Sequence, residues 1–366
     1  MKKLSPRFLI SGGGTGGHIF PALSIADALR ERFPDCVIHF VGAKGRMEME
    51  RVPDAGYSIT GLWISGIDRS RPLKNALFPI KFFLSLARAF FLIQKFKPQL
   101  VIGTGGFASG SLLSVAGFLG VPTLIQEQNS YPGLTNRKLG RKAKTICVAY
   151  EGLEKYFPKH KILLTGNPVR KDLTTPLPKR DDALSHFGFS DGPVVLILGG
   201  SLGAKNINKA VERELMNWLN WGYRIIWQTG KLYYNDLKAR IEPHPNLWMN
   251  AFVTDMPKAY AAADVVLSRA GAGTLSELAI VNKPAILVPS PNVADDHQTK
   301  NAQMFFRKGA ASIITEAQLP TQLGNSLKSL METPTKRVQM TKAMQELALP
   351  KATENIVIAI ETLLKL

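Results

Sequence analysis

The chain has 366 residues, of which 45% are hydrophobic and 20% charged, and its 46 Lys and Arg against 28 Asp and Glu give a net charge of +18. This length and composition indicate a globular protein of about two domains and argue against a disordered or repeat protein. The two cysteines, Cys36 and Cys147, lie in apolar runs without metal-ligand spacing, so we predict buried thiols in a reducing, cytoplasmic compartment and no metal site.

The positive charge is concentrated in the first half of the chain. Residues 1–168 hold 23 Lys and Arg but only 10 Asp and Glu, and no acidic residue occurs between Arg69 and Gln126. Such an excess predicts an anionic partner. Nucleic acid, an anionic membrane surface and a polyphosphate substrate are all consistent with this charge.

Strands and helices alternate along the first half. Apolar runs predict strands at 8–11, 37–42, 100–104, 123–127 and 145–149. Helical patterns fit residues 20–33, 46–54, 73–96 and 107–119. The alternation predicts a parallel sheet with crossover helices in a domain spanning 1–168. The segment 166–180 holds three prolines and few apolar side chains, so we expect a linker there.

Strands and helices alternate in the same way along the second half, which predicts a second α/β domain at 169–350. Strands fit 194–199, 223–228, 247–253, 264–268, 284–289 and 310–315. Helices fit 205–220, 232–241, 273–282 and 295–308. The amphipathic tail 351–366 is expected to form a helix that packs back on the first domain.

A glycine-rich loop, GGGTGGH at 12–18, follows the first strand. Such loops direct bare backbone N–H groups and a helix N-terminus at an anion. Dinucleotide binding is disfavoured, because the second predicted strand has no acidic residue at its end to hold a ribose. His18 is either a general base acting on a sugar hydroxyl or a residue that only caps the helix or binds phosphate.

The second glycine loop, GGSLGA at 199–204, and the segment SRAGAGTLSE at 268–277 each follow an apolar strand. Helix N-termini and neutral donors there suit a diphosphate without a metal clamp, since no Asp-x-Asp pair occurs. Glu277 either binds ribose hydroxyls or merely favours the helix dipole. Together with the polar cluster around Gln298, these loops predict a nucleotide-sugar site.

Two further features lie in the first half. In residues 69–97, cations recur every seven residues between large apolar side chains, which predicts either an interfacial membrane helix or a crossover helix that packs on its sheet. Glu127 is the first acidic residue after this basic tract, and it is either a catalytic base or an ion-pair partner.

Several motifs occur together in a familiar order. They are GGGTGGH (12–18), TGGFASG (104–110), QEQN (126–129), GLTNR (133–137), TGNPVR (165–170), GGSLGA (199–204), SRAGAGTLSE (268–277), and the pair HQ and NA (297–302). With this set, which runs nearly the whole length, the chain resembles the MurG family of peripheral-membrane glycosyltransferases of bacterial cell-wall synthesis. The resemblance implies a GT-B fold, that is, two Rossmann-like, doubly wound α/β domains with a cleft between them.

The resemblance also implies a site. His18 and Glu127 become the candidate catalytic bases, with His18 preferred. The implied contacts to UDP-GlcNAc are Thr15, Gly16, Gly17, Asn129, Arg170, Ser201, Val253, Ala272, Gly273, Thr274, Leu275, Ser276, Glu277 and Gln298. The residues expected at the membrane are Lys74, Lys81, Phe82, Phe83, Arg88 and Phe90. Phe107 and Leu202 stand where family members often have Tyr and Gln, so no side-chain hydrogen bond is expected from either position.

The implied reaction is inverting transfer of GlcNAc from UDP-GlcNAc to lipid I (undecaprenyl-pyrophosphoryl-MurNAc-pentapeptide), which yields lipid II and UDP in peptidoglycan synthesis. The expected partners are UDP-GlcNAc, lipid I, the anionic cytoplasmic face of the cell membrane, and a complex of cell-wall synthesis and division proteins, with no cofactor and no nucleic acid. The alternatives are a diacylglycerol glycosyltransferase, a UDP-GlcNAc 2-epimerase and a basic nucleic-acid-binding protein, the last without a recognisable binding module.

Overall fold

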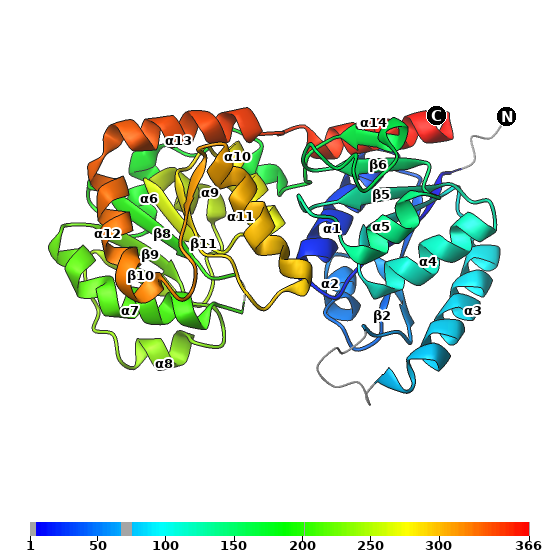
Figure 1. Ribbon diagram of the computed structural model, residues 1–366, viewed down its shortest axis with the longest axis horizontal. Helices are drawn as coiled ribbons and strands as arrows, with labels where there is room; N and C mark the ends of the chain where they lie inside the picture. Colours follow the sequence, from blue (N-terminus) through cyan, green and yellow to red (C-terminus); the bar gives the residue numbers. More distant parts are fainter. Residues whose placement is uncertain (1–4, 67–74, 201, 366) are drawn as a thin grey trace. The chain divides into compact units, whose positions relative to one another are not determined.

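The computed structural model describes residues 5–66, 75–200 and 202–365. The chain divides into two compact units. Unit 1 comprises Met1–Val169 and Lys351–Leu366, and unit 2 comprises Arg170–Pro350. Each unit is an α/β structure with helices on both faces of a parallel sheet, as Figure 1 shows. The prediction of two doubly wound α/β units is therefore confirmed.

Unit 1 has a seven-stranded parallel sheet in the order β3-β2-β1-β4-β5-β6-β7. The strands are β1 (Arg7–Gly12), β2 (Val37–Ala43), β3 (Ser58–Leu62), β4 (Leu100–Gly105), β5 (Thr123–Glu127), β6 (Thr145–Val148) and β7 (Ile162–Leu164). The helices are α1 (Gly16–Arg32), α2 (Glu48–Asp54), α3 (Phe78–Phe96), α4 (Phe107–Phe118), α5 (Leu134–Gly140) and α14 (Ala352–Leu364), with a 3₁₀ turn at Lys159–Lys161.

The two faces of this sheet carry separate cores, because successive side chains of a strand point to opposite faces. Phe8 and Ile10 of β1 pack on one face, whose core also includes Ile356 and Ile360 of α14. Leu9 points to the other face, into a core built with residues of α3 and α4. Because α14 completes the first core, the last helix of the chain belongs to the fold of unit 1.

Unit 2 has a six-stranded parallel sheet in the order β10-β9-β8-β11-β12-β13. The strands are β8 (Val194–Leu198), β9 (Arg224–Gln228), β10 (Leu247–Asn250), β11 (Val265–Ser268), β12 (Ala285–Leu287) and β13 (Ala311–Ile313). The helices are α6 (Arg180–His186), α7 (Lys205–Asn220), α8 (Tyr234–Lys238), α9 (Met256–Ala262), α10 (Ala272–Ile280), α11 (His297–Arg307), α12 (Leu319–Glu332) and α13 (Pro334–Leu347), with 3₁₀ turns at Lys171–Leu173 and Ala294–Asp296.

In both units the strand order reverses beside the first strand of that unit. β1 pairs with β2 on one side and with β4 on the other, and β8 pairs likewise with β9 and β11. In open α/β sheets, ligands bind outside the carboxyl ends of the strands at such a switch point. Both glycine loops, at 12–17 and 199–204, leave the strand that lies at the switch point of their sheet.

Candidate active site

His18 lies in the first turn of α1, directly after the first glycine loop. Its Nδ1 is 3.0 Å from Oε1 of Gln128, which follows the end of β5. Its Nε2 makes no hydrogen bond to any residue in the described part of the chain. The imidazole is therefore anchored at one nitrogen, with the other left for a ligand.

The loop after β4 supports this histidine from the side. The hydroxyl of Thr104 donates to the carbonyl oxygen of His18 over 2.7 Å. Gly105 has φ +116°, and a Cβ atom there would lie 2.7 Å from Nδ1 of His18. At Gly106 a Cβ atom would lie 2.5 Å from the carbonyl oxygen of Gly13. The two glycines of this loop thus allow it to pack directly against the first glycine loop and the imidazole.

The first glycine loop does not present the bare amides that its sequence predicts. The N–H of Gly13 donates to the carbonyl of Gly105 over 3.3 Å. The N–H of Gly14 donates to Oε2 of Glu48 over 3.0 Å, and Oε1 of this buried carboxylate accepts from the N–H of Ala43. The amides of Gly13 and Gly14 are thus occupied by a backbone carbonyl and by a glutamate of the same chain, so at these two positions the loop lacks the bare donors that its sequence predicts.

Thr15, Gly16 and Gly17 form the part of the loop nearest His18. Thr15 and Gly17 are exposed, and Gly16 is half-buried. Thr15 is the N-cap residue of α1, and its carbonyl accepts from the N–H of His18 and of Ile19. The three positions thus lie at or near the surface in the turn that leads into His18.

Glu127 is buried and its carboxylate is fully occupied. Oε1 accepts from the backbone N–H of Asn129 over 3.0 Å and from Nδ2 of the same residue over 3.2 Å. Oε2 accepts from the N–H of Gly133 over 3.1 Å and from Nδ2 of Asn136 over 2.8 Å. Four donors match the four lone-pair positions of a carboxylate. Glu127 thus ties the loop after β5 to α5, and half-exposed Asn129 is held beside it.

Among the described residues of the second glycine loop, in unit 2, Gly200 at φ +85° and Gly203 at φ +87° lie in the left-handed region. A Cβ atom at Gly203 would lie 2.2 Å from the carbonyl oxygen of Thr229, which follows β9. Leu202 points outward and is exposed. The predicted contact at Ser201 lies outside the described residues.

Val253 is buried, and its backbone N–H donates to Oε1 of Gln228 over 3.0 Å. Nε2 of the same Gln228 side chain donates to the carbonyl oxygen of Gly200 over 3.1 Å. Gln228 thus joins the second glycine loop to the segment after β10. The backbone of Val253 is thereby fixed next to the second glycine loop.

The N-terminus of α10 follows β11 at the switch point of unit 2. Its first turn has no acidic residue, and Gly271 is the N-cap. The N–H of Leu275 already donates to the carbonyl of Gly271, and its side chain is buried. The first turn also holds the backbone N–H groups of Ala272, Gly273 and Thr274, which have no acceptor within the helix. Leu275 therefore contributes packing rather than a donor.

Glu277 lies one turn further along α10 and is held from two sides. Oε2 accepts from the hydroxyl of buried Tyr260 over 3.0 Å, and Oε1 lies 3.4 Å from Nε of Arg170. Burial raises the pKa of the Glu277 carboxyl, while the Arg170 charge and the Tyr260 hydrogen bond oppose the rise. Ser276 points its hydroxyl back to the carbonyl of Ala272. Glu277 and Arg170 are thus neighbours, which sequence spacing did not reveal.

Gln298 lies in the first turn of α11 and is half-buried. Its Oε1 accepts from the backbone N–H of Ser290 over 2.9 Å, which leaves the amide end to donate. The preceding Asp295 and Asp296 both have positive φ, 54° and 50°. Adjacent non-glycine residues in this region are strained, and such strain concentrates at functional sites.

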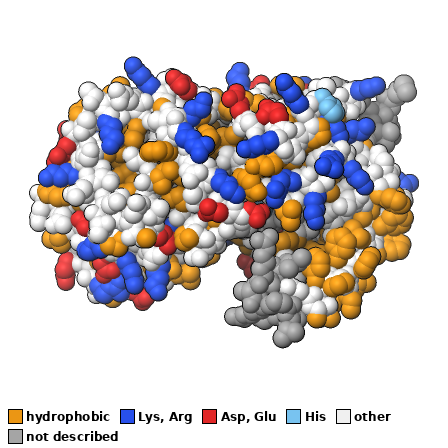
Figure 2. Space-filling model, viewed as in Figure 1, with side chains coloured by type: hydrophobic (Ala, Val, Ile, Leu, Met, Phe, Trp, Pro, Cys, Tyr) orange, Lys and Arg blue, Asp and Glu red, His pale blue; other side chains and the backbone are white. Residues whose placement is uncertain are grey.

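Of the residues predicted at the membrane, the five that the structure describes lie on α3, and three of the five are exposed. Phe82, Phe83 and Arg88 are exposed, whereas only Ser85, Ala89 and Ile93 of this helix are buried. We define the α3 surface as the exposed apolar side chains of α3 together with one at the end of α4. It consists of Ile80, Phe82, Phe83, Leu84, Phe91 and Phe118. Figure 2 shows hydrophobic side chains gathered over this part of unit 1.

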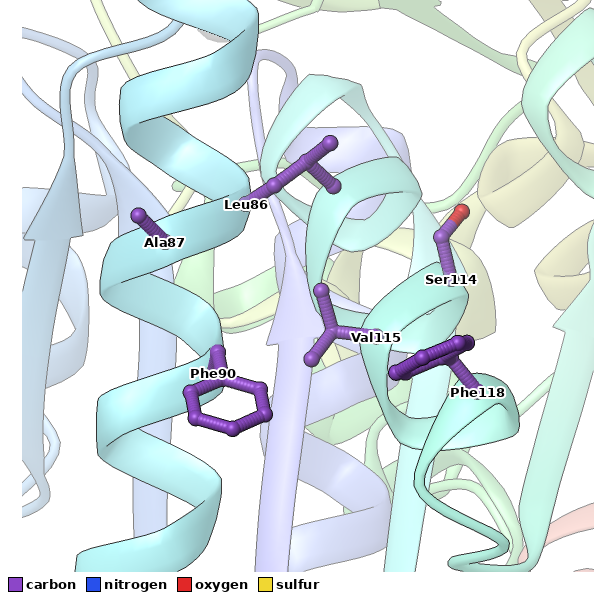
Figure 3. A pocket seen from close by; sticks show the side chains of 6 residues that line it. All are labelled: Leu86, Ala87, Phe90, Ser114, Val115 and Phe118. Atoms are coloured by element: carbon purple, nitrogen blue, oxygen red, sulfur yellow. The ribbon is translucent and has the colours of Figure 1, made fainter.

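Phe90 and Lys81 occupy the margins of the α3 surface. Phe90 packs against the core and lines a groove of about 370 Å³ between α3 and α4, as Figure 3 shows. Nζ of Lys81 lies 5.6 Å from the ring centroid of Trp63. Lys74 lies outside the described residues. No helix in the described part of the chain is long and apolar enough to span a membrane.

Metal-ligating side chains do not gather within the described ranges. No group of three or more His, Cys, Asp or Glu residues there has the arrangement to hold a metal ion. Cys147 is buried, which raises the pKa of its thiol to about 12, and Cys36 is half-buried. Neither thiol is therefore poised for nucleophilic chemistry.

Each of the two units matches a known protein family. Residues 8–148 match the glycosyltransferase family 28 N-terminal domain, and residues 194–356 match the glycosyltransferase family 28 C-terminal domain. The chain is 52% identical over 352 residues to the UDP-N-acetylglucosamine–N-acetylmuramyl-(pentapeptide) pyrophosphoryl-undecaprenol N-acetylglucosamine transferase of Flavobacterium psychrophilum, covering 96% of each chain.

Solved structures agree with this match. The MurG structure from Acinetobacter baumannii superimposes with a TM-score of 0.76 at 31% identity, covering 98% of this chain and 99% of the other. A UDP-N-acetylglucosamine 2-epimerase structure superimposes with a TM-score of 0.65 at 13% identity, covering 98% and 95%, which shows a shared fold alone. The GT-B class is thereby confirmed. On both domain models and on these relatives, the chain belongs to glycosyltransferase family 28 and, within it, to the MurG family.

Proposed function

We propose that this protein transfers GlcNAc from UDP-GlcNAc to the MurNAc sugar of undecaprenyl-pyrophosphoryl-MurNAc-pentapeptide, which converts lipid I to lipid II in peptidoglycan synthesis. The observation that carries the proposal is the 52% identity to a transferase of that name along 96% of both chains. The reaction is a single displacement at the anomeric carbon, so the sugar inverts to a β-1,4 linkage and UDP leaves.

The donor binds unit 2 in this proposal. The uracil meets the backbone carbonyl of Val253, and the ribose hydroxyls meet the carboxylate of Glu277. The diphosphate lies at the first turn of α10, where the amides of Ala272 to Thr274 and the helix dipole favour negative charge. The absence of an acidic residue from that turn supports this assignment. Arg170, beside Glu277, adds a cation at the same edge of the site.

The remaining donor contacts complete the proposal. Gln298 donates from its amide end, since its oxygen already accepts from Ser290. Asn129 and the exposed residues Thr15 and Gly17 lie on unit 1, and we assign them to the transferred sugar and the acceptor. Ser201 in the second glycine loop stays a prediction from the resemblance.

His18 is the general base in this mechanism. Its Nε2 takes the proton from the acceptor hydroxyl as the oxygen attacks the anomeric carbon and the bond to UDP breaks. The electron pair of that bond leaves with UDP, whose charge is met by the donors of α10. Glu127 is the weaker candidate, because four hydrogen bonds already occupy its carboxylate.

The acceptor is a lipid, and we place the protein at the cytoplasmic face of the cell membrane as a peripheral protein. The α3 surface supplies the apolar contact: Phe83 is 69% exposed and Phe91 70%. Lys81, Arg88 and Lys95 recur along the same helix, and their charges suit anionic headgroups. Association with other cell-wall synthesis and division proteins stays a prediction from the resemblance.

The test is an assay with purified protein, UDP-GlcNAc and lipid I, followed by chromatography of the products. We expect lipid II and one UDP for each sugar transferred. Free ManNAc would indicate an epimerase, and a glycosylated diacylglycerol in mixed lipid vesicles would indicate a different transferase. A gel shift with RNA or DNA and no sugar transfer would indicate a nucleic-acid-binding protein. Any of these three results without lipid II would overturn the proposal.

A further inference from the structure

Gln128 is a buried residue between the end of β5 and its loop, and its carboxamide faces His18. Its Nε2 donates to the backbone carbonyl of Thr104 over 2.8 Å and to that of Gln126 over 3.0 Å. Oε1 of Gln126 is a third acceptor within reach of the same nitrogen, so the two amide hydrogens are shared among three oxygens. The opposite end of the carboxamide, Oε1, lies 3.0 Å from Nδ1 of His18.

These partners allow only one orientation of the Gln128 carboxamide. If its two ends were exchanged, its oxygen would face two backbone carbonyl oxygens, which are acceptors only. Because Oε1 therefore faces the imidazole, and an amide oxygen cannot donate, Nδ1 of His18 must carry a proton. A neutral imidazole has one protonated nitrogen, so its Nε2 is bare.

The carboxamides of Asn167 and Gln126 extend this hydrogen-bond network, and each of them also has only one possible orientation. Nδ2 of Asn167 donates to the backbone carbonyl of Gln128 over 2.9 Å, so its Oδ1 is the end that accepts from Nε2 of Gln126 over 2.9 Å. The oxygen of Gln126 is then left to accept from Gln128. All three amides are buried in unit 1. The orientation at His18 is thus fixed by backbone carbonyls at several points.

We propose that Gln128 is a positioning residue that holds His18 as the Nδ1-protonated tautomer and so makes Nε2 the basic nitrogen. The inference rests on the proposed function, in which Nε2 accepts the proton of the acceptor hydroxyl. The bond from oxygen to hydrogen breaks, a bond from Nε2 to hydrogen forms, and the imidazolium later releases that proton to solvent. The other proton stays on Nδ1 of His18 throughout, hydrogen-bonded to Oε1 of Gln128.

The direct test is ¹⁵N NMR of the imidazole nitrogens in the full-length protein without substrate. The chain has six histidines, so the signals of His18 are identified by their loss in a His18→Asn variant. We expect a protonated Nδ1 and a bare Nε2 in the neutral state of wild type. A bare Nδ1 with a protonated Nε2 would overturn the inference, whatever the activity of the enzyme.

A matched pair of substitutions tests the link to catalysis. Gln128→Met removes the acceptor at Nδ1, so we expect the Nε2-protonated tautomer to appear and kcat to fall by at least about tenfold, toward the roughly 10²–10⁴ lost with a general base. UDP affinity, assigned to unit 2, should stay within about twofold. Gln126→Met is the control. It removes a buried carboxamide of the same size but leaves the Gln128 oxygen facing His18, so the His18 tautomer should match that of wild type.

The outcomes separate this inference from the proposed function. An unchanged His18 tautomer in Gln128→Met overturns the positioning role. An altered tautomer with wild-type kcat overturns the role of His18 as the base and with it the catalytic meaning of Gln128. A protein that makes no lipid II but shows the expected nitrogen signals refutes the proposed function while the tautomer assignment stands.

Discussion

Replacing Glu127 by alanine distinguishes a structural carboxylate from a catalytic base. The structure predicts that Glu127→Ala destabilises unit 1, because the carboxylate accepts four hydrogen bonds from the loop after β5 and from α5. A base would instead have a lone pair directed at the substrate. A structural role therefore predicts a loss in the free energy of unfolding, whereas a catalytic role predicts a fall in kcat.

The size of the effect follows from the four donors. Asn129 and Gly133 are both partly exposed, so water can replace the carboxylate at their N–H groups. Asn136 is buried, so its donor loses a charged acceptor without full rehydration. A hydrogen bond to a charged group contributes about 1.5–3 kcal/mol, so we expect a loss of about that size in the free energy of unfolding of unit 1.

The assay is urea unfolding followed by a probe in unit 1, with kcat measured under conditions where the variant is folded. Glu154→Ala is the matched control, because this glutamate is exposed in the same unit and should change stability by less than about 0.5 kcal/mol. A loss below about 1 kcal/mol in Glu127→Ala, combined with a kcat at least about 100-fold lower, would refute the reasoning and make Glu127 the base.

Four further predictions concern other parts of the molecule. His18→Ala should lower kcat by about 10²–10⁴ while calorimetry shows unchanged UDP affinity, and an unchanged kcat would remove His18 from the mechanism. Glu277→Ala should weaken UDP binding in the same titration. Because burial raises the pKa of Glu277 in the folded state, the stability of unit 2 should fall as pH rises from the ordinary glutamate value of about 4.3 toward the raised one, and Glu277→Gln should flatten that fall in pH-dependent urea titrations. Ser substitutions at exposed Phe83 and Phe91 should reduce sedimentation with anionic vesicles without lowering the unfolding temperature, whereas Ser at half-buried Phe90 should lower it; equal vesicle binding by the first pair would exclude the α3 surface.

The fold was largely predictable because apolar runs and glycine loops report buried parallel strands. Prediction failed at both edges of the unit 1 sheet: β3 reads SITGL and β7 reads ILL, and both include exposed or half-buried positions in short segments. The helix α5 is only seven residues long and lies in a loop of mixed polarity, so no helical period was visible. Short edge elements are specified by their neighbours in the fold, and one sequence does not contain that information.

The site was predictable in its loops but not in its contacts. Glycine spacing located His18 and the first turn of α10. It also predicted open amides in the first loop, but the N–H of Gly13 donates to the carbonyl of Gly105, and Glu48 accepts from the N–H groups of Gly14 and of Ala43 at the end of β2. Gln128 and Tyr260 were missed because a buried amide or phenol is recognised only by its partners, which lie far away in sequence. The one available signal was a polar run, QEQN, directly after an apolar strand.

In the proposed reaction the two units have different tasks: the glycine loop of unit 1 positions a base, and unit 2 holds the nucleotide. Backbone amide NMR during titration with UDP tests this most directly. We predict large shifts at Ala272, Gly273 and Thr274, and none at Gly13 and Gly14, whose N–H groups are occupied by Gly105 and Glu48. Saturable shifts at Gly13 and Gly14 with none at the N-terminus of α10 would contradict the account.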